Sequence, residues 1–133
     1  MAKFAATTKV PVSQSRDEIE RTLMRYGASA FGYVQEAERA AVQFRAHERY
    51  VRIEMPIPDT LRAQDIRQRW RALLLVIKAK LEAVESGIGS FEEEFLAHIV
   101  LPNNQTVGQY TLPQVVHAYE SGELPALLPG APE

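Results

Sequence analysis

Basic side chains, the groups in this chain best suited to binding a polyanion, are confined to its first 80 residues. That region holds all 15 Lys and Arg residues and 9 of the 17 acids, a net charge of +6 (15 − 9), whereas the last 53 residues hold 8 acids and no base. Charges gathered in one region act locally, so they say more about partners than the overall net charge of −2. The basic region could attract nucleic acid, or the acidic region of a second copy.

Nine of these cations form the candidate nucleic-acid-binding set. Arginine suits phosphate because its planar guanidinium can donate two hydrogen bonds to one phosphate group, and a groove of such side chains can follow a phosphate backbone. The set comprises Arg39, Arg45 and Arg52 on a predicted sheet, with Arg62, Arg67, Arg69, Arg71, Lys78 and Lys80 on a predicted long helix. The alternative is a solvated helix flank with internal salt bridges, for example between Lys78 and Glu82.

No combination of nucleophile, base and metal ligand points to an enzyme. The chain has no Cys, so it offers no thiolate and no disulfide, which fits a reducing cytoplasm. Glu94 and His98 have the four-residue spacing of metal-ligand pairs, but no third ligand accompanies them and no HExxH signature is present. No Ser stands in a nucleophile elbow, and no glycine loop matches a phosphate cradle. The sequence predicts a protein without catalytic activity, metal or cofactor.

Periodicity predicts the elements that position the cations. After a flexible lead over 1–12, a helix begins near Ser15, where Ser15 and Glu18 match a capping box, and ends at Gly27. Three short strands with hairpin-length connections follow, and their alternation predicts an antiparallel meander with one buried and one wet face. The strands are 31–35, 39–45 and 50–55. The wet face would carry the three sheet arginines.

The clearest predicted element is a helix over 61–86, capped by Asp59 or Thr60. An apolar arc on this helix should face the sheet; it consists of Ile66, Trp70, Leu74, Ile77, Leu81 and Val84. A second apolar strip lies on the far side; it consists of Ala72, Leu75, Val76 and Ala79. This strip is either an oligomer interface, because small residues let another helix approach closely, or the surface on which the later helices fold back. The second interpretation is preferred, because those helices need a surface on which to pack.

The rest of the chain completes an α+β domain. Ser90 and Glu93 form a capping box for a short helix through about Ile99, although 97–101 would serve as helix or strand. A last helix spans 112–121, before an irregular tail over 124–133. The 133 residues are therefore expected to form one domain: an N-terminal helix, a three-stranded antiparallel meander packed on one long helix, then two short helices. No apolar run is long enough to span a membrane.

The segment WRALLLVIKAKLEAVESGIGSFEEEFLAHIV over 70–100, followed by LPNNQTVG, resembles a family of small uncharacterised proteins encoded by phages and prophages. The resemblance runs from about residue 10 to residue 129 and implies a phage or prophage setting in a bacterial cytoplasm, but no activity. The order of elements is also similar to the core of phage single-strand annealing proteins, which bind DNA in a basic groove beside the long helix. By position alone, that similarity implies that Arg67, Arg71, Lys78 and Lys80 face the DNA.

These observations favour a phage-type, non-enzymatic nucleic-acid-binding protein, with single-stranded DNA as the preferred partner and annealing or recombination as its setting. It would act in the bacterial cytoplasm as a homo-oligomer that joins a basic front to an acidic back. The alternative is a phage-encoded inhibitor that binds and blocks a host protein or defence complex. Small size and the lack of catalytic residues favour this alternative, which predicts no binding to bare DNA.

Overall fold

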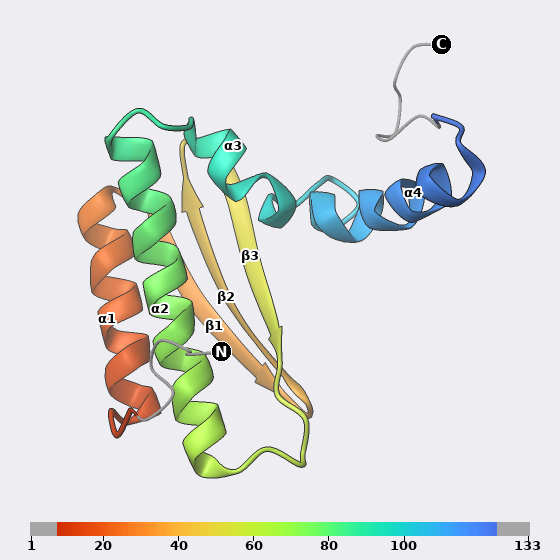
Figure 1. Ribbon diagram of the computed structural model, residues 1–133. Helices are drawn as coiled ribbons and strands as arrows, with labels where there is room; N and C mark the ends of the chain where they lie inside the picture. Colours follow the sequence, from red (N-terminus) through yellow and green to blue (C-terminus); the bar gives the residue numbers. More distant parts are fainter. Residues whose placement is uncertain (1–7, 125–133) are drawn as a thin grey trace.

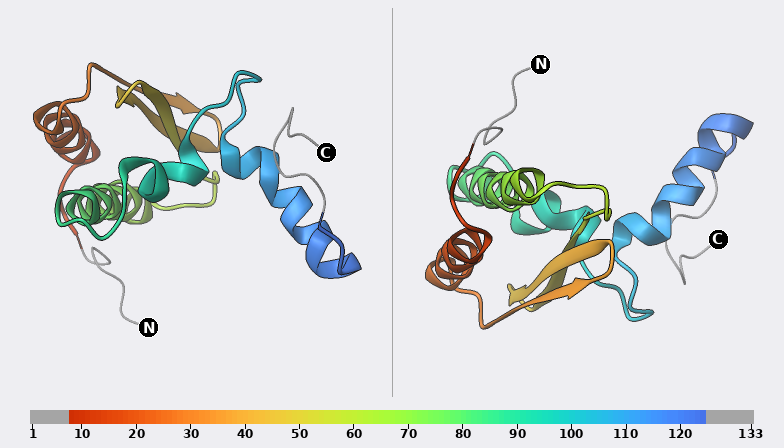
Figure 2. Two further views of the ribbon diagram at one scale, coloured as in Figure 1. Left: turned by 90° about the horizontal axis from the view of Figure 1, so that it is seen from above. Right: turned by 90° about the horizontal axis from the view of Figure 1, so that it is seen from below.

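A computed structural model describes residues 8–124 of the protein and shows the predicted order of elements (Figure 1). The elements are α1 (Val12–Tyr26), β1 (Ala30–Glu36), β2 (Arg39–Ala46), β3 (Arg49–Pro56), α2 (Ala63–Glu85), α3 (Phe91–Phe95), the 3-10 turn η1 (Leu96–His98) and α4 (Val107–Ser121). The antiparallel sheet has the order β1-β2-β3, as a meander requires. Helices α1 and α2 pack together on one face of the sheet (Figure 2). The α+β fold predicted from the sequence is confirmed.

The core lies between the sheet and the two long helices, where the predicted apolar arc of α2 is buried. Trp70, Leu74, Ile77 and Leu81 are almost completely inaccessible, and Ile66 and Val84 lie half-buried at the ends of the arc. They pack with the inner face of the sheet and with the buried stripe of α1; these partners include Val42, Phe44, Val51, Ile53, Ile19 and Leu23. The helical and strand periodicities thus meet in one core, as binary patterning predicts.

The hairpin between β2 and β3 has a two-residue turn, His47 and Glu48, in which both residues have positive φ (51° and 60°). Such φ values are typical of type I′ turns, which usually contain Asn or Gly. The His47 ring is held in place, because it stacks on Phe91 with a centroid distance of 4.7 Å and its Nε2 lies 3.1 Å from the Tyr26 hydroxyl. The turn therefore ties the sheet to α1 and α3.

The capping box predicted at Ser15 is wrong. Helix α1 begins at Val12, directly after Pro11, whose φ of −60° already suits a helix start. Ser15 recurs with Ile19 and Leu23 at four-residue intervals, and all three are completely buried. Its hydroxyl belongs to the face of α1 that packs in the core and has no hydrogen-bond partner among the described residues. The end of the helix at Gly27, with φ of +116°, is as predicted.

Helix α2 begins later than predicted, after Arg62 rather than after Asp59 or Thr60. The carboxylate of Asp65 accepts hydrogen bonds from the backbone N–H of Arg62 at 3.1 Å and from its Nε at 3.2 Å. These bonds lower the pKa of Asp65, the side-chain bond from Arg62 having the largest effect. A carboxylate in the first turn also complements the helix dipole.

Helix α4 begins at Val107, five residues before the predicted start. The hydroxyl of Thr106 accepts a hydrogen bond from the Gln109 N–H, and the Gln109 side chain accepts one from the Thr106 N–H. This reciprocal cap starts the helix, which continues through Pro113. The ambiguous stretch before it is neither a continued helix nor a full strand: after η1, Ile99 forms an isolated antiparallel bridge with Val51, and Val100 forms another with Thr106.

The C-terminal helix does not fold back on α2. It packs mainly on η1 through its first turns, where a Cβ on Gly108 would lie 2.9 Å from the carbonyl oxygen of Ala97, and it then projects away from the body (Figures 1 and 2). The preferred interpretation of the α2 strip is therefore wrong for α4, and Leu75 and Val76 stay 40% and 46% exposed. Within residues 8–124, no helix combines the length and the apolar character that a membrane span needs.

Candidate nucleic-acid interface

The structure places the three sheet arginines on the face of the sheet away from α1 and α2, where Arg52 also donates to Asn104 and to Gln109 of α4. The strand register puts Arg39, Arg45 and Arg52 on the side of the sheet opposite to the buried core residues of β2. Arg39 pairs with Glu36 at 2.9 Å and with Glu54 at 2.7 Å, and Arg52 pairs with Glu54 at 3.1 Å. Neutralised in this way, Arg39 and Arg52 add little attraction for phosphate. Arg45 has no ion pair among the described residues, and its guanidinium lies 5.5 Å from the centre of the Tyr50 ring.

The cations of α2 diverge to the two sides of that helix. Arg71 pairs with Glu18 of α1, whereas Arg69 donates to the carbonyl oxygen of Pro56 at the end of β3. Lys80 donates to the carbonyl oxygen of Glu94 at 2.8 Å. Of the remaining three, Arg62 at the helix N-cap pairs with Asp65 and Arg67 donates to Gln64, whereas Lys78 has no ion pair or hydrogen bond among the described residues. The nine predicted residues therefore do not line a single groove, and most of them hold elements of the fold together.

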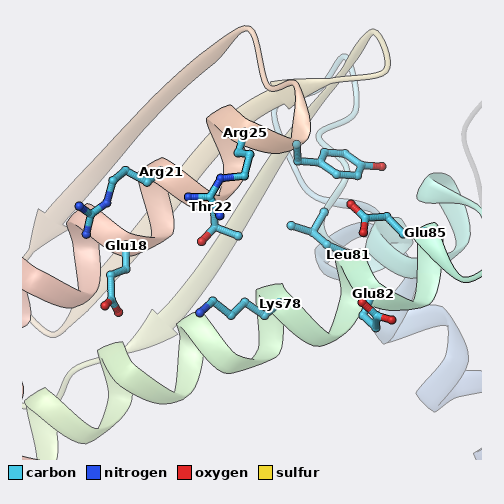
Figure 3. A pocket seen from close by; sticks show the side chains of 9 residues that line it. Glu18, Arg21, Thr22, Arg25, Lys78, Leu81, Glu82 and Glu85 are labelled. Carbon is cyan, nitrogen blue, oxygen red and sulfur yellow. The ribbon is translucent and has the colours of Figure 1, made fainter.

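One member of the predicted set, Lys78, joins two cations outside it, Arg21 and Arg25, around a hollow of about 580 Å³ between α1 and α2. Arg21 and Arg25 of α1 and Lys78 of α2 line it, together with Thr22 and Tyr26 (Figure 3). Lys78 extends along α2 on the side that faces α1. All three cations are exposed, and none makes an ion pair or hydrogen bond within the described part of the chain.

Arg21 and Arg25 do not belong to the set that the sequence predicts, which is limited to the sheet and the long helix. The signal was present in α1: Glu18, Arg21, Thr22 and Arg25 recur at i, i+3, i+4 and i+7, beside the apolar stripe. This spacing predicts one helix face. What the sequence does not provide is the identity of the helix that this face meets.

The hollow also has acids, and their positions divide it into two parts. Glu82 and Glu85 lie toward the α3 end, and Glu18 at the other end is already paired with Arg71 (Figure 3). Burial, followed by the charges of Glu85 and Glu92, raises the pKa of Tyr26, so its phenol stays protonated. The lining thus holds three cations and three carboxylates, and Glu18 is the only one of the six with an ion pair among the described residues, so Arg21, Arg25 and Lys78 stay available to a ligand.

Metal chemistry finds no support in residues 8–124, since no three His, Asp or Glu side chains gather there as a site would require. Burial, and then the nearby charge of Lys80, lower the pKa of His98, the histidine of the candidate metal-ligand pair. A neighbouring ammonium group disfavours a cation at this position.

Acid is expected to destabilise the protein through His98. Its pKa in the folded state lies below the ordinary value of 6.5, so below that pH the unfolded chain binds a proton that the folded chain resists. Stability should therefore be complete above pH 6.5 and fall as the pH drops toward the folded-state pKa. Thermal unfolding between pH 7.5 and pH 5.5 should show a smaller loss for His98→Gln than for the original chain. An equal loss in both would mean that His98 does not titrate as described.

Comparisons with known proteins identify no relative for this arrangement. The chain matches no family model, and it matches neither a curated protein nor a solved structure. The function is therefore inferred from the surfaces themselves, and two of them stand out: the cationic hollow between α1 and α2, and the projecting helix α4.

Proposed function

We propose that the protein is a non-enzymatic nucleic-acid-binding protein of phage type, which holds single-stranded DNA against the hollow between α1 and α2. The observation that carries this proposal is the convergence of Arg21, Arg25 and Lys78, exposed and unpaired within the described residues, on one hollow from two packed helices. Cations that the fold does not use are the ones available to a ligand.

The chemistry fits a phosphate backbone. The two guanidinium groups can each donate two hydrogen bonds to a phosphate, and Lys78 adds a compact charge on the opposite side. Rigid helices hold the three groups apart, so they can contact successive phosphates. A single strand bends easily into a hollow of this size, whereas duplex DNA is stiff over about 150 base pairs and would need a wider surface. These properties favour a single strand.

The proposal is tested by fluorescence polarisation of a labelled single-stranded oligonucleotide at several salt concentrations. Three phosphate contacts to a single strand should give a slope of about −2 for the logarithm of the binding constant against the logarithm of salt concentration, at about −0.7 per contact. The duplex of the same sequence, as control, should bind more weakly. Absent binding at low salt, or binding that does not respond to salt, would contradict the proposal.

A further inference from the structure

Helix α4 has an apolar face that nothing in the described chain covers. Leu112, Val115, Val116 and Tyr119 recur at i, i+3, i+4 and i+7, so they lie along one side of the helix. Leu112 is 61% exposed and Tyr119 is 89% exposed, and α4 has no buried residue. A 15-residue helix is marginal in water unless one face is packed. This helix therefore needs a surface that residues 8–124 do not provide.

The α2 strip is the matching uncovered face. Ala72, Leu75, Val76 and Ala79 have the same i, i+3, i+4 and i+7 spacing, and they point away from the sheet. Side chains at this spacing are the anchors by which one helix recognises another. Helix α3 also packs on α2, where Lys80 donates to the carbonyl oxygen of Glu94, but it leaves Leu75 and Val76 exposed.

The side chains of the two faces are complementary in size, as close packing between two helices requires. The α4 face has its large side chains, Leu112 and Tyr119, at the ends, whereas the α2 strip has Ala72 and Ala79 at its ends. Large residues opposite small ones allow close packing, and in whichever direction the helices run the large ends of one meet the small ends of the other. Pairing α2 with α2 would instead leave Ala opposite Ala, and pairing α4 with α4 would crowd the bulky ends together.

Charge supports the same pairing. The chain from 101 to 124 has no base, and its acids are Glu120 and Glu123, at the C-terminal end of α4. Four bases flank the strip, but Arg69, Arg71 and Lys80 already bond to Pro56, Glu18 and Glu94. Lys78 is the flanking base that is exposed and has no partner among the described residues. We propose that α4 of one copy docks on the α2 strip of a second copy. Lys78 lies beside both the strip and the hollow, but the apolar residues of the interface do not line the hollow. Cross-linking therefore tests the interface independently of nucleic-acid binding.

Cysteine cross-linking tests the pairing directly, because the chain has no Cys of its own. A chain with Leu75→Cys is mixed with a chain with Val116→Cys and oxidised; both positions are central in their faces, so the direction of the helices does not matter. A disulfide-linked pair is expected in the mixture at several times the yield of either chain alone. As a matched control, Val34→Cys, which is similarly exposed on β1, replaces Leu75→Cys and should give no such increase.

Light scattering on a size-exclusion column gives the second readout. The original chain should have at least the mass of a dimer, and Val116→Asp should weaken association about 100-fold, because it places an unpaired carboxylate in an apolar interface. Val34→Asp should have no effect. Circular dichroism verifies that the body of each variant is folded. A monomer at the highest concentration reached would overturn the proposal. So would a chain carrying both Leu75→Cys and Val116→Cys that forms only an intrachain disulfide.

Discussion

Replacing Trp70 by Ala is expected to lower the free energy of unfolding by about 3–5 kcal/mol, as the loss of a large buried ring usually does. Trp70 is 1% exposed, so its removal leaves a cavity between α2 and the sheet. The ring also meets Tyr33 of β1 edge to face at 6.5 Å and lies 4.6 Å from the guanidinium of Arg16. Both contacts would be lost with the ring, so α1, α2 and β1 would lose a shared anchor.

Urea unfolding followed by circular dichroism measures this effect; fluorescence is unsuitable, because Trp70 is the only Trp in the chain. The unfolding midpoint should fall while the slope against urea stays the same, since the surface exposed on unfolding hardly changes. Leu75→Ala on the same helix is the matched control, because Leu75 is 40% exposed in the isolated chain. At a protein concentration low enough for a monomer, it should cost below about 1 kcal/mol. A loss of that size for Trp70→Ala would mean that the ring is not part of the core.

Trp70 also shows why so much of the fold could be predicted. The arc of α2 and the alternation in β2 and β3 are direct consequences of burial, because a side chain faces the core only at certain intervals along a helix or strand. The same constraint fixed the meander, since three strands that each bury one face and join through short turns have few other arrangements. Periodicity therefore predicts element type and order well.

Helix starts were predicted less well, because competing caps look alike in a sequence. Ser15 and Glu18 have the residue types of a capping box, but Ser15 falls on the stripe that packs against α2. Thr106 and Gln109 do form such a box, at positions before the predicted helix start at 112. Which residue caps a helix depends on which side chains the tertiary structure leaves free to hydrogen-bond the backbone groups at the helix end.

The candidate site was the least predictable part, since the sequence shows where charges occur but not what they meet. Arg71 and Lys80 look available in the sequence, yet one pairs with Glu18 and the other caps a carbonyl group near α3. The charge split along the chain is similarly mixed in space, because Arg49 of β3 lies 3.9 Å from Glu92 of α3. Only the packing of α1 against α2 reveals which cations remain unpaired.

The triple substitution Arg21→Ala, Arg25→Ala and Lys78→Ala is expected to weaken single-stranded DNA binding by about 100-fold at low salt. It removes three phosphate contacts, and so it should also bring the salt slope closer to zero by about 2. All three side chains are exposed, so the fold should tolerate the change, which circular dichroism can verify. Polarisation titrations between low and moderate salt supply both numbers.

A matched triple substitution on other faces separates the hollow from the set predicted by sequence. Arg39→Ala, Arg45→Ala and Arg62→Ala remove the same total charge, so a general, long-range attraction would weaken equally in both variants. Contacts at the hollow would instead leave the salt slope of this second variant close to that of the original chain, because Arg39 and Arg62 are already in ion pairs. If the second triple had the larger effect, the binding surface would be the outer face of the sheet. Equal effects would mean that the protein attracts DNA without a defined site, so the comparison tests the location of the site as well as its existence.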